Sequence, residues 1–402
     1  MISHGPDASA VAAAVARDPV LARIEWPDSA PRTSLVGGAV RDAILGVAHG
    51  PDLDLVVEGD AIALARVLGR ALGGRVLAHP RFGTARIEFA HGRHLDMVTA
   101  RREAYARPGA LPDVTPGTLD DDLARRDFTV NAIAFVLHGD GAAGIIDPHG
   151  GRDDIVAERI RLIRPGAFEE DPSRLVRGLR YAARLGFRMD VPTEAEARAI
   201  APGVSLDSSR VADEAARMLS EDAAPLALGM AQALGAGWPD PDPLRDDRLN
   251  MLPVVLARAG APAPPTWALR LGLGVDEAAV RSAAVPQWAR GVAAEVRVGL
   301  ATAPLVTGAS RPSEVDALLR DLPAAQQVGA LVAGAEAVAR WWAEWRDAAP
   351  AVSGADLVAA GVAPGPAIGR ALRAVRAAVL DGEAGEPEQQ LAIALAVAGG
   401  GA

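Results

Sequence analysis

Short runs of residues typical of β-strands occur only in the first part of this chain, and this asymmetry strongly constrains the fold. Such runs lie at 35–36, 53–57, 85–89 and 95–99, with helix-like segments at 39–45 and 62–72 between them. Beyond about residue 155 the pattern becomes helical, at 174–187, 193–201 and 209–219, and from 222 onward the chain is alanine-rich with prolines at its joints. The sequence therefore predicts an α/β or α+β part, preceded by a helix within residues 1–30 and followed by helices alone.

Composition excludes several classes of chemistry. The 402 residues include no cysteine, which excludes disulfide frameworks, thiolate metal sites and cysteine nucleophiles. All 41 basic residues are arginine, so a Walker A P-loop and lysine Schiff-base chemistry are excluded as well. The net charge of −10 argues against non-specific coating of nucleic acid and leaves room for a local basic groove.

The chain shows no sign of membrane insertion or export. No apolar run is long enough to span a bilayer, and acidic residues at 7, 18 and 28 do not suit a secretory signal. We therefore expect a cytoplasmic protein with no membrane partner. All seven histidines lie within the first 149 residues, so a histidine-rich hydrolase module cannot follow the helical part.

Two neighbouring features predict phosphate and metal binding. Gly37 and Gly38 lie between a short strand and an expected helix, where backbone N–H groups and the helix dipole favour an anion. Asp52 and Asp54 begin an apolar strand, and residues i and i+2 of a strand share one face. Two like charges so placed are usually tolerated because they hold a divalent cation. Each feature alone is also typical of an ordinary turn, but their spacing together favours nucleotidyl transfer.

A third carboxylate, Asp96, lies in another alternating run. If its strand neighbours the first one, Asp96 completes the catalytic cluster; otherwise it is a surface residue. His91 and His94 beside it are expected to be surface or packing residues, because Mg²⁺ prefers oxygen ligands.

Three further motifs complete the set. They read RRDFTVNA at 125–132, IDPHGGRDD at 146–154 and EDPSRLVR at 170–177, the last continuing into YAARLGF at 181–187. With the glycine pair and the Asp-x-Asp pattern, they closely resemble the class II tRNA nucleotidyltransferases and the related bacterial poly(A) polymerases, in order and spacing. The resemblance covers residues 35 to about 220, and 353–383 is similar to that family's C-terminal tail.

The resemblance implies an α+β fold and a division of the chain. It implies a nucleotidyltransferase-type mixed sheet with helices in a catalytic head domain at 31–150, after the N-terminal helix of 1–30. A nucleotide-reading helical neck would follow at 151–222, and a helical body and tail that bind tRNA at 223–402.

The resemblance also implies roles for individual residues. Asp52 and Asp54 would hold two Mg²⁺ ions. The nucleotide would be bound by Gly37, Gly38 and Arg41 at its triphosphate, by Arg126, Asp127 and Asn131 at its sugar, and by Asp171 and Arg174 at its base.

The last of these roles also has a physical basis. On one helix, Asp171 and Arg174 would share a face at i and i+3, and an acceptor beside a donor matches the edge of cytosine or adenine. A plain surface ion pair would have the same spacing. Arg177, Arg180 and Arg184 would extend this face as a basic stripe for triphosphate or RNA phosphates, or as a solvated face paired with Glu169 and Glu170.

Other segments carry weaker expectations. The stretch 99–112 mixes acidic and basic residues, which resembles family loops that permit addition of A. Arg210 and Glu214 resemble the fifth family motif, in which they would buttress helices. Trp341, Trp342 and Trp345 are expected to pack in a core or an interface rather than stack on bases.

The predicted function is template-independent addition of CCA, or part of it, to the acceptor arm of tRNA, from CTP and ATP by two-metal transfer. Enzymes that add only CC or only A, and poly(A) polymerases, share these motifs and remain alternatives. A retired homologue that binds RNA and a nucleotidyltransferase acting on a small molecule are further alternatives. The sequence leaves the oligomeric state open.

Overall fold

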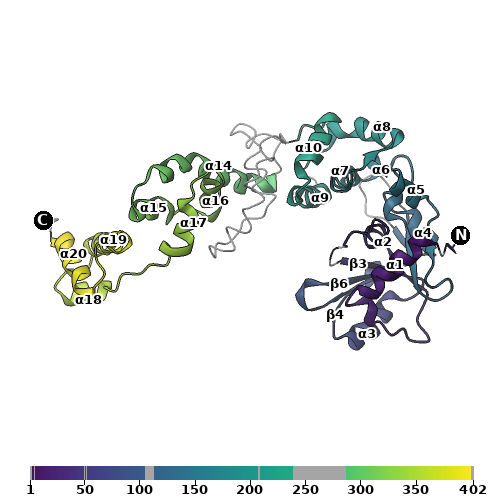
Figure 1. Ribbon diagram of the computed structural model, residues 1–402, viewed down its shortest axis with the longest axis horizontal. Coiled ribbons are helices and arrows are strands. Elements are labelled where there is room, and N and C mark those ends of the chain that lie inside the picture. Colours follow the sequence, from purple (N-terminus) through teal and green to yellow (C-terminus); the bar gives the residue numbers. More distant parts are fainter. Residues whose placement is uncertain are drawn as a thin grey trace. The chain divides into compact units, whose positions relative to one another are not determined.

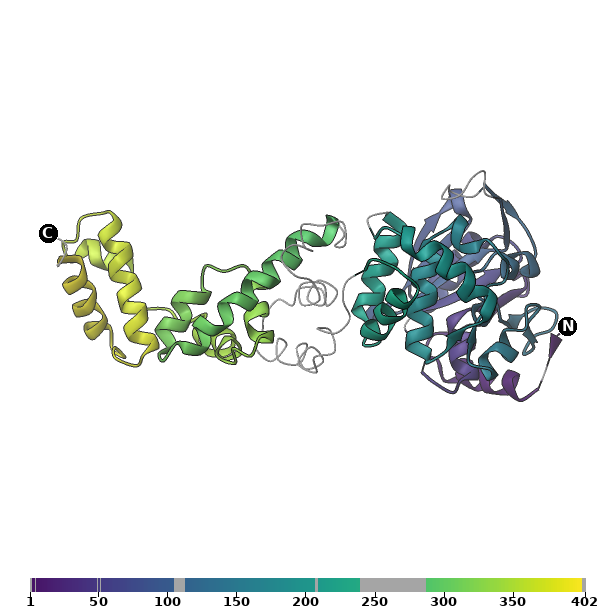
Figure 2. The same ribbon diagram turned by 90° about the horizontal axis from the view of Figure 1, so that it is seen from above.

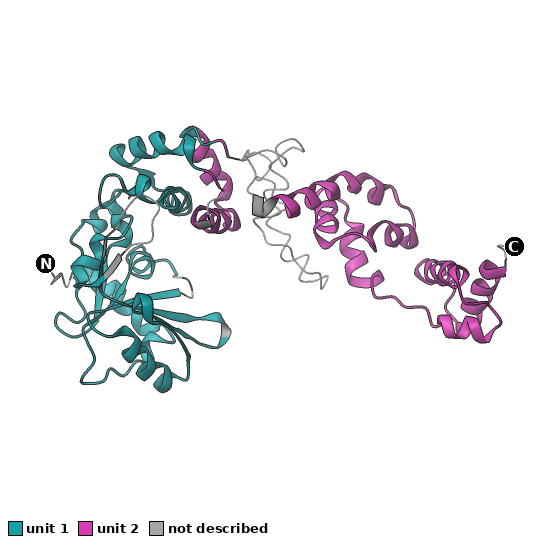
Figure 3. Cartoon of the chain, turned by 180° about the vertical axis from the view of Figure 1, so that it is seen from behind, with its two compact units in different colours: residues 1–204, 233–236 teal, residues 205–232, 237–402 magenta. Residues whose placement is uncertain are grey.

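The computed structural model describes residues 2–3, 5–48, 50, 52–104, 113–206, 209–238 and 287–399. The chain divides into two compact units (Figure 3): unit 1 is Met1–Val204 with Ala233–Ala236, and unit 2 is Ser205–Gln232 with Gly237–Ala402. The boundaries predicted after residues 30, 150 and 222 remain predictions. Among the described residues, no helix has the length and apolar character needed to cross a membrane.

Unit 1 is built on a mixed eight-stranded sheet (Figure 1). Within this sheet, β3 and β6 are parallel neighbours, and the other neighbouring strands described there are antiparallel. The predicted runs correspond to β2, β3, β5 and β6, and the predicted fold class is confirmed. In spatial order the strands are β1 (Ile2–Ser3), β10 (Ile145–Ile146), β9 (Ala134–His138), β2 (Thr33–Val36), β3 (Asp52–Val57), β6 (His94–Thr99), β5 (Thr84–Glu88) and β4 (Arg75–His79).

Helices cover most of the sheet but leave part of one face open. Helix α3 (Ala61–Leu72) packs on one face of the sheet, where its Gly69 approaches Val76 of β4 and Ile87 of β5. Leu95 of β6 is paired with Ile87 and therefore lies on the same face. On the other face, Val56 packs with Leu119 and Leu123 of α4 (Leu119–Ala124). Because Val56, Asp54 and Asp52 alternate along β3, the two carboxylates lie on this second face, beyond the part that α4 covers.

The N-terminal region and the loops of unit 1 contain short helices. Helix α1 (Pro6–Arg17) is the helix expected within residues 1–30, and α2 (Gly38–Ile44) follows β2 at the glycine pair. The remaining short elements are the 3₁₀ turns η1 (Leu21–Arg23), η2 (Pro80–Phe82), η3 (Ala90–Gly92), η4 (Thr129–Asn131) and η5 (Ala201–Gly203), and the hairpin of β7 (Arg101–Ala104) with β8 (Asp113–Pro116).

A helical segment follows the sheet in unit 1. It contains α5 (Gly151–Val156), α6 (Ala167–Glu170), α7 (Ser173–Leu185) and α8 (Val191–Ile200), with β11 (Arg159–Ile160) paired to β12 (Arg188–Met189). Phe128, fully buried, contacts the rings of Phe168 and Tyr181. A side chain at Gly178 of α7 would place its Cβ 2.8 Å from Phe128 Cζ, so glycine permits α7 to pack directly on the residues around Phe128.

Unit 2 is helical throughout its described residues. It begins with α9 (Ser209–Ser220) and α10 (Ala224–Ala233). Further along are α14 (Gln287–Gly308), α15 (Pro312–Leu319), α16 (Ala324–Val332), α17 (Ala337–Arg340), the π-helical turn η7 (Trp341–Trp345), α18 (Gly354–Ala359), α19 (Pro366–Leu380) and α20 (Pro387–Gly399). Helices α14 and α16 touch backbone to backbone at Gly299 and Gly329.

The predicted packing role of the tryptophans is confirmed. Trp341 and Trp342 are buried in a core of α14 to α17, and Trp345 packs against it. Helices α18, α19 and α20, drawn in yellow toward the C-terminus in Figure 2, contribute a second core that contains Leu357, Val375 and Ala394.

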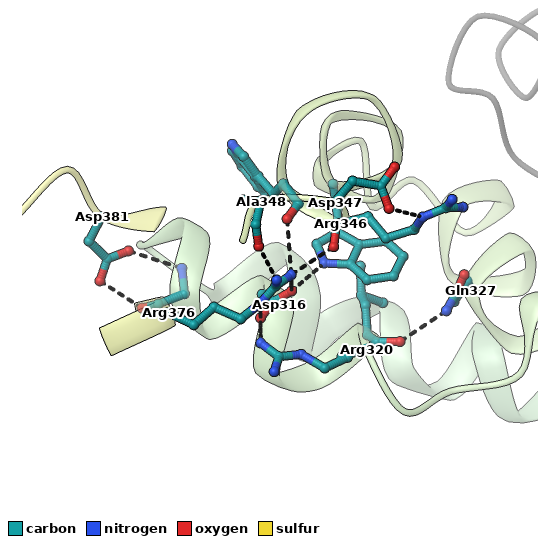
Figure 4. A network of polar contacts seen from close by, with 12 residues as sticks. Asp316, Arg320, Gln327, Arg346, Asp347, Ala348, Arg376 and Asp381 are labelled. Carbon is teal, nitrogen blue, oxygen red and sulfur yellow. Dashed lines mark hydrogen bonds and ion pairs between the residues drawn. The ribbon is translucent and has the colours of Figure 1, made fainter. Parts of the chain in front are cut away.

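A buried polar network joins these two cores (Figure 4). Asp316 of α15 accepts hydrogen bonds from Trp341 Nε1 at 2.9 Å, from Arg376 of α19 and from Arg320. Arg376 also donates to the backbone carbonyls of residues 345, 346 and 348, at the end of the π-helical turn and just after it. One buried carboxylate therefore connects α15, η7 and α19.

Candidate active site

A cleft of about 810 Å³ lies on the open face of the sheet in unit 1. Side chains of β3 to β6 form one part of its lining, and the glycine pair, the RRD segment and α7 form the other. The structure brings together most of the predicted site residues here: Gly37, Gly38, Asp54, Asp96, Arg126, Asp127, Asn131, Asp171, Arg174 and Arg177 all line the cleft. Asp52 is beside it on β3, whereas Arg41 and Arg180 are not in its lining.

The two predicted metal-binding carboxylates lie on one face of β3. Asp52 and Asp54 keep accessible surface, whereas Leu53 and Leu55, which alternate with them, are buried, as the alternation predicts. The Asp54 residue is open on one side, but its carboxyl lies among atoms of the cleft walls, and this loss of hydration raises its pKa; Arg126 opposes this shift, and repulsion from Asp96 and Asp52 adds to it. A divalent cation would relieve this crowding, and carboxylate oxygens are its preferred ligands, so the pair fits Mg²⁺.

Asp96 lies directly opposite Asp54 in the register of β3 and β6, so the strand neighbourhood on which its role depended is present. Its two oxygens accept hydrogen bonds from Arg86, Nε at 2.7 Å and Nη2 at 2.8 Å. His94 Nε2 lies 3.2 Å from Asp52 and 3.4 Å from Asp96. In the part of the chain that the structure describes, no group of three or more His, Asp or Glu side chains is arranged to hold a metal. Asp96 as a third ligand therefore remains a prediction.

The glycine pair is adjacent to the carboxylates. Gly37 has φ of +76°, a conformation that side chains disfavour, and a Cβ there would lie 3.1 Å from Arg126 Nη1 and 3.7 Å from Asp54 Oδ2. Gly38 begins α2 and lines the same cleft, so the helix end whose first N–H groups lack intrahelical acceptors lies at the cavity. Glycine thus keeps open the space between a carboxylate and a guanidinium.

Arg41 differs from its expected position at the triphosphate. Its side chain is only 1% exposed, donates to Asn131 Oδ1 at 2.5 Å and to Asp42 Oδ1, and lies over the ring of Tyr181. Since its charge is paired and its head group buried, Arg41 supports Asn131 from behind the cleft in this arrangement.

The RRD segment places two cations, Arg125 and Arg126, and one anion, Asp127, at the cleft. Arg126 donates to the backbone oxygen of Asn131 and to Asp122. Asp127 is buried and accepts from the Phe128 N–H at 2.8 Å and from Arg177 Nη1 at 2.8 Å. Burial alone would raise the pKa of Asp127, but Arg177 and the backbone donor outweigh it and lower the pKa.

The two residues expected to read the base lie together, though on different elements than predicted. Asp171 is the extended residue that ends α6, and Arg174 is in the first turn of α7. They do not share a helix, but the Arg174 N–H donates to the Asp171 carbonyl and both side chains line the cleft. Asp171 Oδ1 accepts from the Ser173 hydroxyl at 2.6 Å, and Glu170 lies 3.6 Å from Arg174. Both side chains are therefore held by neighbours while facing the cavity.

The arginines of the predicted basic stripe on α7 do not all reach the cleft. Arg177 faces the cleft, whereas Arg180 and Arg184 lie 4.6 and 5.3 Å from the centre of the Tyr181 ring. Sequence reasoning missed Tyr181, which lines the cleft, and Arg86; the signal for Arg86 is its cross-strand position opposite Asp96.

Two weaker expectations fall partly outside the described residues. Positions 105–112 of the loop lie outside them, so its effect on A addition stays a prediction. In the fifth motif, Glu214 is buried on α9 and accepts from Arg217 at 2.9 Å, and the buttressing role of Arg210 and Glu214 stays a prediction.

Comparisons with known proteins identify the class and then the family. The sequence model of the poly A polymerase head domain matches residues 33–161, the segment that contains the carboxylates and the strands of the sheet from β2 to β10. The chain is 36% identical over 356 residues to a CC-adding tRNA nucleotidyltransferase of Deinococcus radiodurans, covering 88% of this chain and 85% of that protein. The protein therefore has the head domain of a nucleotidyltransferase. It belongs to the class II, CCA-adding family of tRNA nucleotidyltransferases, which are enzymes.

Other relatives match a smaller part. An A-adding tRNA nucleotidyltransferase of Halalkalibacterium halodurans is 43% identical over 180 residues, and the match covers 45% of this chain and 42% of that protein. For the A-adding enzyme of Aquifex aeolicus the match covers only 20% of the relative's length. Among solved structures, the apo form II of a CCA-adding enzyme has the same fold, with a TM-score of 0.71 at 23% identity over 91% of both chains.

Proposed function

We propose that this protein is a tRNA 3′-end nucleotidyltransferase that adds CCA, or part of it, from CTP and ATP without a nucleic-acid template. The observation that carries the proposal is the cleft itself, which combines Asp54, the glycine pair and the Asp171–Arg174 pair in one cavity. Membership of the family supports the same activity, with the tRNA acceptor arm as partner and the cytoplasm as its place.

The triphosphate would lie between the glycine pair and Arg126. Gly37 leaves room for it, the α2 N–H groups and dipole favour its charge, and Arg126 is fixed by Asp122 and the Asn131 carbonyl. Arg177 is fixed in turn by Asp127, which leaves an oriented cation facing the cavity. These groups would neutralise charge on the nucleotide without moving during the reaction.

Asp52 and Asp54 would hold Mg²⁺. When bound, two such ions lower the pKa of the attacking 3′-hydroxyl and neutralise the triphosphate and the leaving pyrophosphate. No protein nucleophile is required, which agrees with the absence of cysteine and lysine.

The Asp171–Arg174 pair would select the base. Asp171 offers an acceptor and Arg174 a fork of donors, the combination that matches the exposed edges of cytosine and adenine. Because Ser173 and Glu170 hold these side chains, recognition would not need a template strand.

CC addition alone is the second candidate. It is favoured by the relative that covers 88% of this chain, whose name is CC-adding. The mixed charges of residues 99–112 favour addition of A and therefore the whole CCA.

The test is extension of tRNA transcripts that end at the discriminator base, at C and at CC, with Mg²⁺ and labelled CTP, ATP or both. Extension to CCA followed by a stop is the expected result. Arrest after CC, or action on the CC-ended transcript alone, would assign a specialised enzyme. A ladder of A on any RNA would mean polyadenylation, and no extension would favour a retired RNA-binding homologue.

A further inference from the structure

Five residues that are paired in register across five neighbouring strands form a row through the sheet at the cleft. Val36, Asp54, Asp96, Arg86 and Leu77 are paired in register across β2, β3, β6, β5 and β4. Neighbouring strands lie about 4.8 Å apart, so the Arg86 backbone is roughly 10 Å from that of Asp54. The glycine pair follows Val36 on the opposite side of Asp54.

Arg86 is oriented by its partner. Nε and Nη2 both donate to Asp96, at 2.7 and 2.8 Å, in the bidentate arrangement that fixes a planar guanidinium. The Nη1 edge therefore projects away from Asp96. The Arg86 side chain is 44% exposed and lines the cleft, together with Arg101 and Arg125.

In the proposed reaction, this order of residues would place the nucleotide and the RNA on opposite sides of Asp54. In nucleotidyl transfer the attacking oxygen and the leaving group lie roughly in line, on opposite sides of the reacting phosphorus. If the triphosphate lies on the glycine side of Asp54, the strand that brings the 3′-hydroxyl approaches from the β6–β5 side. Its last phosphodiester then passes the edge of the cleft where Arg86 is held.

We propose that Arg86 binds the terminal phosphodiester of the RNA being extended, and that Asp96 is the positioning residue that aims it. This inference rests on the proposed function. A guanidinium donating to a phosphate oxygen forms a charge-assisted hydrogen bond, whose loss corresponds to about a tenfold effect or more.

The experiment combines protein variants with a change in the RNA. Wild-type protein, Arg86→Gln and Arg75→Gln are compared on two tRNA transcripts, one ordinary and one whose last linkage is an uncharged methylphosphonate. Arg75 is the matched control, because it too forms a cross-strand ion pair, with Glu88 at 2.7 Å, but does not line the cleft. The readouts are kcat/KM for RNA, KM for CTP and the Kd of each RNA by fluorescence anisotropy.

We expect the Arg86→Gln change and the uncharged linkage to remove the same interaction. Wild type and Arg75→Gln should prefer the charged linkage by about tenfold, while Arg86→Gln loses about tenfold on ordinary RNA and shows little preference. Equal behaviour of the two variants would overturn the proposal. A raised KM for CTP with the linkage preference intact would do so as well, and would assign Arg86 to the triphosphate. If the wild-type protein extends neither RNA, the proposed function fails. The ratio of the Kd values for the two RNAs, in wild type and in Arg86→Gln, then decides whether Arg86 binds the last linkage.

Discussion

Arg177 and Asp127 are 50 positions apart in sequence, yet Arg177 Nη1 donates to Asp127 Oδ2 at 2.8 Å. The contact attaches α7 to the segment that follows α4, and both residues line the cleft. The two halves of the proposed nucleotide site, phosphate side and base side, are therefore connected by one partly buried ion pair.

Removing this pair should cost stability in a pH-dependent way. The pKa of Asp127 is below its ordinary value of 3.8, so its carboxylate stabilises the fold above that pH, and the stabilisation disappears as the pH falls through the lower folded value. Asp127→Asn should lose about 1–3 kcal/mol at neutral pH, since Arg177 is a third exposed. Denaturant unfolding at pH 7 and through a series of pH values below 3.8 measures this, and a deficit that stays constant over the whole series would contradict it.

Neutralising Asp54 should abolish transfer without weakening the fold. Asp54→Asn removes a metal-binding oxygen, and we expect activity below about 1% of wild type, from a loss of several kcal/mol of transition-state stabilisation. The same change reduces repulsion from Asp52 and Asp96, so the thermal unfolding midpoint should not fall. Filter binding of tRNA is the control and should change less than about twofold. Activity above a few per cent of wild type would show that Asp54 is not required for transfer.

Changes at the base-reading pair should alter nucleotide choice. Asp171→Asn and Arg174→Gln each disrupt a bidentate-type match, which corresponds to about 1–3 kcal/mol of discrimination. The ratio of incorporation of CTP and ATP over UTP and GTP should therefore fall by about tenfold or more, while the Mg²⁺ concentration for half-maximal rate stays the same. Unchanged selectivity in both variants would exclude a template role for the pair.

Gly37 and Gly46 provide a matched comparison. Both have a positive φ, +76° and +71°, and Gly37, with ψ of −136°, lies in a region that only glycine adopts readily. A Cβ at Gly46 meets nothing within 4 Å, whereas at Gly37 it enters the space between Arg126 and Asp54. Gly46→Ala should lose about 1–2 kcal/mol of stability from backbone strain, and Gly37→Ala at least as much. Only Gly37→Ala should also lose transfer, by tenfold or more in kcat/KM for CTP. Equal activity of the two variants would show that the glycine pair only forms a turn.

The helix crossing in unit 2 should tolerate no side chain. A Cβ at Gly329 would lie 2.2 Å from the Val296 carbonyl oxygen, a backbone atom that cannot move alone. Gly329→Ala should cost about 1–3 kcal/mol, as overpacking does. Gly369→Ala on α19 is the control, since its Cβ would meet only the end of the flexible Arg373 side chain, and better helix propensity should leave it equally or more stable. A Gly329→Ala variant as stable as the control would contradict the close crossing.

Periodicity was sufficient to predict the elements that carry the chemistry. The alternation around Asp54 and Asp96 predicted β3 and β6, and the strands are neighbours as the catalytic cluster required. Sequence could not show which carboxylate would be engaged by a cross-strand partner, because Arg86 meets Asp96 only through the register of β5 and β6.

Arg41 and Asp171 show which details of position lie beyond a sequence motif, while their roles toward the nucleotide stay predictions. Arg41 follows the glycines closely enough to be assigned to phosphate, but the turn of α2 directs it to Asn131, 90 positions later, a contact that no local pattern encodes. The spacing of Asp171 and Arg174 predicts a shared helix, whereas Pro172 stands at the start of α7 and Asp171 is extended.

Cutting the chain near residue 350 would separate the buried carboxylate of Asp316 from one of its partners. It is 2% exposed and is neutralised in part by Arg376, which comes from α19, beyond the connection at 348–353. A fragment that ends at this connection would keep Asp316 but lose one of its two guanidinium partners, and the carbonyls after the π-helical turn would lose their donor. The helices before and after residue 350 are thus joined through one buried charge, and a truncation between them would leave Asp316 with Arg320 as its guanidinium partner.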